Sequence, residues 1–253
     1  MRGVISCLFG VLAVSSACSS SNDVNVMASD GSVDVSAEAA SDAGTDSPIA
    51  YPSGPYGLAE GDVFPNHSWM GYRHGKGDFI PIACSDYYDP TGAKGIRAVF
   101  FTVNTTGGRS MTAALEVMYS KFYAGTGAEF PAALIANDKY DPPSKAQFDN
   151  WVSAVKATFD VILAPETKTD AGVSSELIGA TGATPTNYLI DPRTMRIVNV
   201  SMGWDPEVKP CTTSGDCAPD HTCKADKACS ATGGWFFASL DALITKNGGT
   251  APF

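Results

Sequence analysis

Residues 99–118 predict, in succession, a buried strand, a glycine turn and an amphipathic helix, and this succession constrains the fold more than any other feature of the sequence. The run IRAVFFTV at 96–103 is rich in β-branched and aromatic residues, as expected of a strand that is covered on both faces. We therefore expect a central strand that leads into a helix ending at Gly125 or Gly127. The apolar residues that recur at helical spacing after the glycine turn are Met111, Ala114, Leu115, Met118 and Phe122.

Strands and helices alternate through the rest of the chain. Residues 142–159 predict the clearest helix, because Ser144 and Gln147 have the spacing of a capping box. Ahead of the central strand, two apolar segments predict a short hairpin or extended pair closed by the turn at 89–92. This alternation predicts an α/β domain built in layers around a sheet. Further strands are predicted at 130–138, 160–164, 186–191 and 196–203, and a last helix at 235–247.

Residues 1–17 predict a secretory signal peptide, with one positive charge at Arg2, an apolar run and then small residues. The sequence around Cys18 resembles a bacterial lipobox, in which cleavage occurs before a cysteine that receives lipid. Cys18 is therefore the expected lipid anchor. Ser15 stands where that motif prefers leucine, so ordinary cleavage after Ala17 is the alternative.

Residues 18–50 predict an acidic tether. After the anchor cysteine, the segment consists largely of Ser, Asp, Ala and Gly, with six acidic residues and no basic or aromatic ones. Such a composition cannot bury enough apolar surface to offset its ordering entropy, so we expect disorder here and a folded domain at 51–253. The formal net charge is −10. Without a basic patch, nucleic acid is not an expected partner.

Several segments together resemble a known fold family. They are GDVFPN at 61–66, the strand that leads into a glycine-bearing helix start, GATPTNYLIDPRTMRI at 182–197, and GW at 203–204. Over residues 57–206 the chain resembles the redoxin branch of the thioredoxin fold, which holds TlpA-like and AhpC/TSA-like proteins. Within this branch, it most resembles exported lipoproteins of myxobacterial type. The resemblance implies a three-layer thioredoxin-like domain with a central mixed sheet.

The resemblance also implies a binding groove. In this family the proline at the position of Pro185 is cis, and the preceding residue, here Thr184, offers its backbone to an extended substrate. A groove is therefore expected between this peptide and the turn at 104–109. The alternative is a proline that merely opens a strand, a position where proline is readily tolerated.

The turn lacks the residue that thiol chemistry requires. The fold activates a cysteine at a helix N-terminus, where the dipole and the unpaired N–H groups lower the thiol pKa. Here the turn carries no cysteine, so thiol–disulfide exchange at this site is excluded. Either threonine could cap the helix, and the glycines and the arginine could bind an anion or a peptide carboxylate. The alternative is a solvated arginine beside a decayed site. The turn residues are Thr105, Thr106, Gly107, Gly108 and Arg109.

Cys84 is the only cysteine in the part of the chain that resembles a redoxin. We expect a small buried apolar residue, the common state of a free cysteine. The alternative is a relocated peroxidatic thiol.

A cysteine-rich insertion is predicted at 207–232. Four cysteines at a strict interval of six in an exported chain predict two disulfides, with three possible pairings. A resemblance to small cysteine-rich repeats of myxobacterial surface proteins favours pairing the first with the third and the second with the fourth. A zinc site would show a closer pair, so no metal or cofactor is expected. The four cysteines are Cys211, Cys217, Cys223 and Cys229.

Two classes of function remain open. The first is a cell-envelope lipoprotein, periplasmic or at the outer membrane or cell surface. Its redox-inactive thioredoxin-like domain would be a binding or structural module for an envelope protein or peptide, and only the lipid anchor would touch the membrane. The alternative is a redoxin-type oxidoreductase or peroxidase that works through Cys84.

Overall fold

The computed structural model describes residues 49–165, 167–169, 172–174, 177–178, 184–202, 211–213, 216, 222–223, 229–230 and 237–252. The chain divides into two units between Ser47 and Pro48, and all described residues belong to the second unit. The predicted signal peptide, Cys18, nearly all of the predicted tether and Cys217 lie outside the described residues.

One mixed sheet organises the domain. The strands lie in the order β10-β9-β3-β5-β6-β1-β2, and β4 pairs with β3 beside this path. The β3–β5 and β5–β6 pairs are parallel, whereas β9, β10, β1 and β2 join by antiparallel pairing. The strands are β1 Ser68–Tyr72, β2 Phe79–Ala83, β3 Ala98–Thr105, β4 Ala128–Glu129, β5 Ala132–Ala136, β6 Val161–Leu163, β9 Thr186–Asp191 and β10 Arg196–Met202.

In the described part of the chain, two short hairpins stand outside this sheet. The first pairs β7 (Thr167–Thr169) with β8 (Gly172–Ser174), and the second pairs β11 (Thr222–Cys223) with β12 (Cys229–Ser230).

The predicted central strand is confirmed. β3 lies between β9 and β5 and is buried along its length up to Asn104. Its side chains alternate between two apolar clusters, so that Phe100 packs on one face of the sheet and Phe101 on the other. This double coverage explains why the strand is a nearly continuous apolar run.

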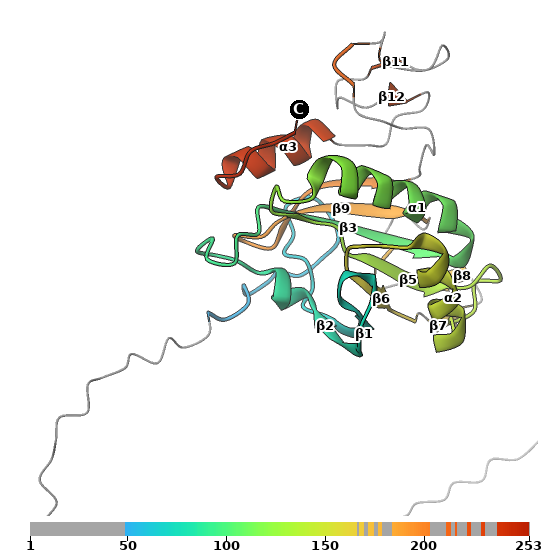
Figure 1. The fold of residues 1–253 in the computed structure, drawn as a ribbon. Helices are drawn as coiled ribbons and strands as arrows, with labels where there is room; N and C mark the ends of the chain where they lie inside the picture. The colour runs from blue at the N-terminus through green and yellow to red at the C-terminus, as the bar shows by residue number, and fades with distance from the viewer. Residues whose placement is uncertain are drawn as a thin grey trace, which may run out of the picture. The chain divides into compact units, whose positions relative to one another are not determined.

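The α-helices among the described residues pack on one face of the sheet (Figure 1). They are α1 (Arg109–Met118), α2 (Lys145–Val155) and α3 (Phe237–Lys246). The opposite face is covered by the N-terminal segment around Phe64 and by η2 (Cys84–Tyr87), a short 3-10 helix.

The capping box predicted for α2 is present. The Ser144 backbone N–H donates to Gln147 Oε1 at 2.9 Å, and Gln147 N–H donates to Ser144 Oγ at 3.3 Å. The helix stops earlier than predicted, because Lys156 takes a left-handed conformation. Phe159 is buried in the core, but it lies beyond the helix.

The hairpin before β3 is formed by β1 and β2, but the predicted closing turn is wrong. The chain reverses at 73–78, where His74, Gly75 and Gly77 have positive φ. The turn at 89–92 comes later and leads into β3.

The helix after β3 differs from its prediction in its second half. α1 gives way after Met118 to a π-helix, Tyr119–Tyr123, and Gly125 follows with positive φ. The wider π turn rotates the buried face, so Tyr123 enters the core where the spacing predicted Phe122.

Candidate functional site

The sheet register brings the two halves of the predicted groove to one end of the domain. β3 ends at Thr105, and η3 (Thr106–Gly108) then leads into α1. β9 runs antiparallel to β3, with Val103 opposite Thr186. The residues just before β9 therefore lie beside the end of β3. We call this end of the sheet the turn end.

The Thr184-Pro185 peptide is cis, as the resemblance implies. Pro185 is buried, whereas Thr184 is partly exposed. Thr184 thus keeps part of its surface accessible at the turn end.

The predicted threonine cap of α1 is wrong. Gly108 is the N-cap residue, and no side chain caps the helix. The Thr106 hydroxyl instead donates to Asp138 Oδ1 at 2.5 Å, because Asp138 lies in the loop that follows β5, the parallel neighbour of β3. Residues 137–138, predicted as strand, belong to this loop.

A cavity of about 470 Å³ opens at the turn. Arg109 is exposed at its edge, and the Asp138 carboxylate lies 3.3 Å from where a Cβ on Gly107 would be. The Asp138 carboxylate would repel a simple anion in this cavity. The geometry therefore favours a ligand that carries both donor and acceptor groups, such as a peptide, over the predicted anion. The cavity is lined by Thr106, Gly107, Arg109, Ser110, Ala113, Asp138 and Ala154.

A buried polar row near the turn end was missed by the sequence analysis. Asn104 Nδ2 donates to Thr102 Oγ1 at 3.0 Å, and Asn187 Nδ2 donates to Ser201 Oγ at 3.4 Å. Both asparagines are 1% exposed, yet neither side-chain oxygen has a hydrogen-bond partner. Buried acceptors without partners call for water or a ligand. The available signal was an asparagine inside each of two apolar strands.

Cys84 is a buried core residue, as expected. It follows β2, four positions from β3 in the strand order, and it is 3% exposed. Burial raises the pKa of its thiol to about 12. Only about one thiol in 10⁵ is then ionised at pH 7.

One of the two predicted disulfides is described. Cys211 and Cys223 are joined, with their Cα atoms 5.8 Å apart. This agrees with the pairing that the resemblance implies and places a disulfide before α3. The partner pair involves Cys217, which lies outside the described residues, and Cys229, of which only the backbone is described. A disulfide fits an exported protein.

Together, these features identify the fold. A parallel β3–β5–β6 core, an antiparallel β9–β10 pair and a cis proline that opens β9 beside the β3–α1 turn match the arrangement that the resemblance implies. The domain has a thioredoxin-like fold.

Solved structures similar to this thioredoxin-like domain include enzymes of thiol exchange. A hypothetical protein from Sinorhizobium meliloti matches at 16% identity and TM-score 0.47, covering 78% of this chain and 89% of that chain. The thioredoxin domain of a thiol-disulfide oxidoreductase from Bacteroides vulgatus matches at 15% identity and TM-score 0.42, covering 59% of this chain and 92% of that chain. A secreted thiol-disulfide isomerase from Corynebacterium glutamicum matches at 14% identity and TM-score 0.42, covering 58% of this chain and 88% of that chain.

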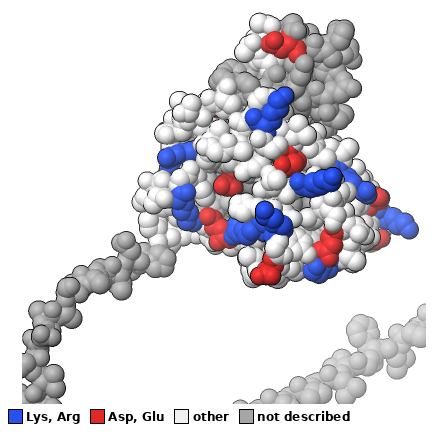
Figure 2. Space-filling model, in the orientation of Figure 1, with Lys and Arg blue, Asp and Glu red and all other residues white. Residues whose placement is uncertain are grey.

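These identities are too low for an activity to be carried over to this thioredoxin-like domain. No family model matches the chain, and no curated protein aligns with it. Within the described residues, no group of His, Cys, Asp and Glu side chains is arranged to hold a metal ion. None of the helices in the described part of the chain is long and apolar enough to span a membrane. Basic and acidic side chains are interspersed on the face seen in Figure 2.

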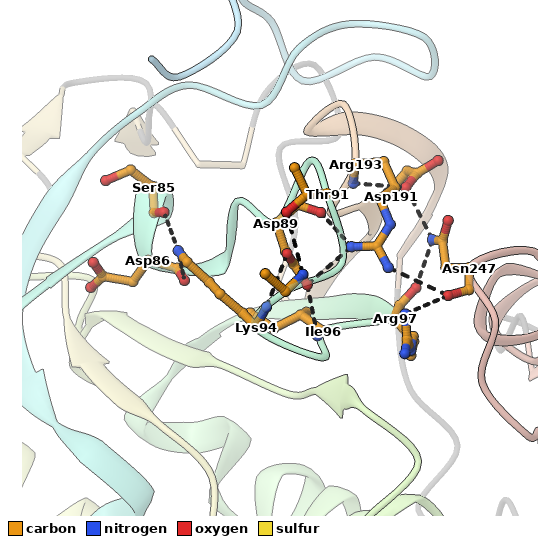
Figure 3. A network of polar contacts seen from close by, with 11 residues as sticks. Ser85, Asp86, Asp89, Thr91, Lys94, Ile96, Arg97, Asp191, Arg193 and Asn247 are labelled. Carbon is orange, nitrogen blue, oxygen red and sulfur yellow. Dashed lines mark hydrogen bonds and ion pairs between the residues drawn. The ribbon is translucent and has the colours of Figure 1, made fainter. Parts of the chain in front are cut away.

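A second polar region of the thioredoxin-like domain lies where β3 begins and β9 ends, and we call it the base end. Asp89, 1% exposed, accepts hydrogen bonds from the N–H groups of Lys94 and Ile96 at 3.2 and 3.0 Å. It also pairs with Arg193 at 3.0 Å (Figure 3). Burial alone would raise the pKa of Asp89, but these hydrogen bonds outweigh it and hold the pKa below its ordinary value.

Asp191 completes the base end. Its carboxylate accepts from Lys246 Nζ at 2.9 Å, from Asn247 Nδ2 at 3.1 Å and from Arg193 N–H at 3.0 Å. Burial would raise its pKa, but the bonds from Lys246, Arg193 and Asn247 lower it. Since every oxygen has a partner, the base end fastens the end of α3 to the sheet.

Proposed function

We propose that the protein is an exported, lipid-anchored protein of the cell envelope whose thioredoxin-like domain binds an extended peptide segment of a partner without thiol chemistry. One observation carries this proposal. The turn where the fold would present a catalytic cysteine consists of Thr105 and η3, which carry no thiol. The free thiol among the described residues, Cys84, is buried.

The side chains at the turn support binding over catalysis. A hydroxyl becomes a nucleophile only beside a strong base such as histidine or an amine. The histidines among the described residues, His67 and His74, flank β1, three positions from β3 in the strand order. The Thr106 hydroxyl is instead engaged as a donor to Asp138.

An extended peptide matches the polar groups that remain at the turn end. Thr184 is partly exposed just before β9, where its backbone can pair with another extended chain. Arg109 and Asp138 offer one charge of each sign at the cavity, so peptide groups and mixed charges can be accommodated there. The unpartnered oxygens of Asn104 and Asn187 lie buried at the same end of the sheet, beneath these exposed groups.

Binding is tested with a library of extended peptides and the purified protein. We expect a subset of peptides to bind to the unmodified protein. The Ser110→Trp variant should not bind them, because Ser110 is exposed and lines the cavity, so the larger side chain would fill the cavity. Ser53→Trp places the same side chain at an exposed position outside the cavity and should bind normally. Equal binding by both variants would contradict the peptide site.

Catalysis is tested by insulin reduction and by peroxide consumption. The protein and its Cys84→Ser variant should both stay at the background rate. An activity that disappears with Cys84→Ser would support the oxidoreductase alternative, and an activity that persists would mean that the chain has another catalytic group.

The envelope location rests on the sequence of residues 1–18 and is supported by the Cys211–Cys223 disulfide. We expect acyl labelling of the protein in its native host, and its loss in Cys18→Ser. Labelling that persists in this variant would rule out Cys18 as the anchor.

A further inference from the structure

A second cavity, of about 670 Å³, lies toward the base end, away from the turn. Its walls come from residues 94–97 before β3, 124–129 after the π-helix, and 248–250 after α3, with Tyr119 beside them. A Cβ on Gly95 or Gly125 would meet nothing within 4 Å, so the space in front of both glycines is open. The volume is in the range of small-molecule sites.

The two basic residues of this cavity are already engaged elsewhere. Lys94 Nζ donates to the carbonyls of Asp86 and Ser85 at 2.9 and 3.3 Å, and Figure 3 shows its side chain directed toward them. Arg97 Nη1 donates to the Asn247 carbonyl at 2.7 Å. Both cations thus donate to backbone carbonyl groups. The carbonyl that accepts from Arg97 lies just after the end of α3.

Glu129 is the cavity's acid, and it has no such partner. It is partly buried at the end of β4, and no described residue donates a hydrogen bond to it or pairs with it. Burial and then the nearby Asp160 raise the pKa of Glu129, while His74 and Arg73 oppose the shift. The Glu129 carboxyl group therefore has no direct hydrogen-bond or ion-pair partner among the described residues, and the charges of Arg73 and His74 only partly offset the effects of burial and Asp160 on its pKa.

The charged groups that act on Tyr119 are also negative. Burial raises the pKa of its phenol, and the charges of Glu129, Glu116 and Asp160 add to that rise. The residues that follow the carbonyl end of the helix closing at Tyr123 also line this cavity, and helix C-termini favour cations. Tyr119 is among the residues that line the cavity, and aromatic rings attract ammonium groups.

We propose that this cavity binds an organic ammonium group, with the Glu129 carboxylate as its counter-ion and Tyr119 beside it. The site is distinct from the turn end and does not depend on peptide binding there. The ammonium group can belong to a free diamine or to a lysine side chain of a peptide, and these two sources share the same chemistry.

Matched probes test the charge requirement. 1,6-Diaminohexane and the uncharged 1,6-hexanediol are titrated separately into the purified protein, followed by calorimetry and by amide chemical shifts of residues 124–129 and 248–250. We expect saturable binding of the diamine, and binding of the diol at least about tenfold weaker, the order expected for a hydrogen bond to a charged group. N-acetyl-lysine amide, titrated in a third arm, distinguishes the two sources: binding as tight as the diamine assigns the site to lysine side chains, weaker binding to free diamines.

Matched variants test the residue. Glu129→Gln should weaken diamine binding about tenfold or more. Asp78→Asn removes the same charge from the exposed turn between β1 and β2 and should leave binding unchanged. Thr250→Trp, at an exposed position on the cavity wall, should block binding while leaving Glu129 intact, which keeps the test valid if Glu129→Gln folds poorly.

Three results would overturn the proposal: equal affinity for the diamine and the diol, undiminished diamine binding by folded Glu129→Gln, or undiminished binding by Thr250→Trp. Inorganic phosphate that displaces the diamine from these same residues would also overturn it, because the cavity would then select anions.

Discussion

At the turn end of the sheet, Asn104 and Asn187 each keep a buried side-chain oxygen without a partner, whereas at the base end every carboxylate oxygen of Asp89 and Asp191 accepts a hydrogen bond. The two ends belong to the same strands, because β3 and β9 run from one to the other. All four side chains are buried, so the difference between the two ends is not one of burial.

The comparison separates polar groups that hold the fold from polar groups that the fold leaves unsatisfied. At the base end, a buried carboxylate is matched by backbone and side-chain donors, and removing it would leave several donors unpaired. At the turn end, the buried oxygens of Asn104 and Asn187 accept no hydrogen bond, so removing either oxygen leaves no donor unpaired. This supports binding at the turn end and a structural role at the base end.

The largest expected effect concerns the thiol, because the comparison assumes that no reactive sulfur serves the turn end. Cys84 in the folded protein should react with iodoacetamide at pH 8 at least about 10³ times more slowly than in urea, since its pKa of about 12 lies well above the ordinary value. Thiolate forms only as the pH rises toward 12, so the protection should decrease at alkaline pH. Peptide mass spectrometry of the Cys84 peptide measures the rate. Fast labelling of the folded protein would break the comparison.

The next effect is at the base end. Asp89→Ala should lower the free energy of unfolding by about 3–5 kcal/mol, because the partly buried Arg193 loses its carboxylate partner and the N–H groups of Lys94 and Ile96 lose their acceptor. Urea denaturation at pH 7 measures this change. Asp78→Ala, at an exposed position, should change it by less than about 0.5 kcal/mol. A small loss in Asp89→Ala would show that the base end is not a clamp.

The smallest effect is at the turn end. Asn104→Leu should change the free energy of unfolding by no more than about 1 kcal/mol, because one hydrogen bond to Thr102 is lost while an unpartnered oxygen is removed. The same urea measurement applies. A loss as large as that of Asp89→Ala would mean that Asn104 is structural, and the contrast between the two ends would fail.

Local patterns predicted much of the fold. The bounds of β9 agree with the predicted strand at 186–191, the capping box of α2 is present, and β3 is the predicted central strand. These features depend on periodicity and on contacts within a few residues, which a sequence displays directly. The β1–β2 turn was misplaced because several glycine-containing segments compete for it, and only strand pairing selects one.

The candidate sites were less accessible to prediction. The Thr106–Asp138 hydrogen bond joins residues 32 positions apart, and it exists because β3 and β5 are parallel neighbours. Glu129 is one of several acids in the sequence, and only the packing of three separate loops gives it a cavity. No local pattern marks either residue.

By itself, the sequence determined that the turn after the central strand has no sulfur, since a missing residue type cannot be restored by folding. It also determined the α/β order of the elements, since hydrophobic periodicity is a local property of the chain. Only the tertiary structure decided which of the described polar groups were satisfied, that Cys84 was buried, and that Glu129 had no direct ion-pair partner among the described residues. Partners and pKa values depend on which distant segments come together in a medium of low dielectric constant, and strand register sets that arrangement.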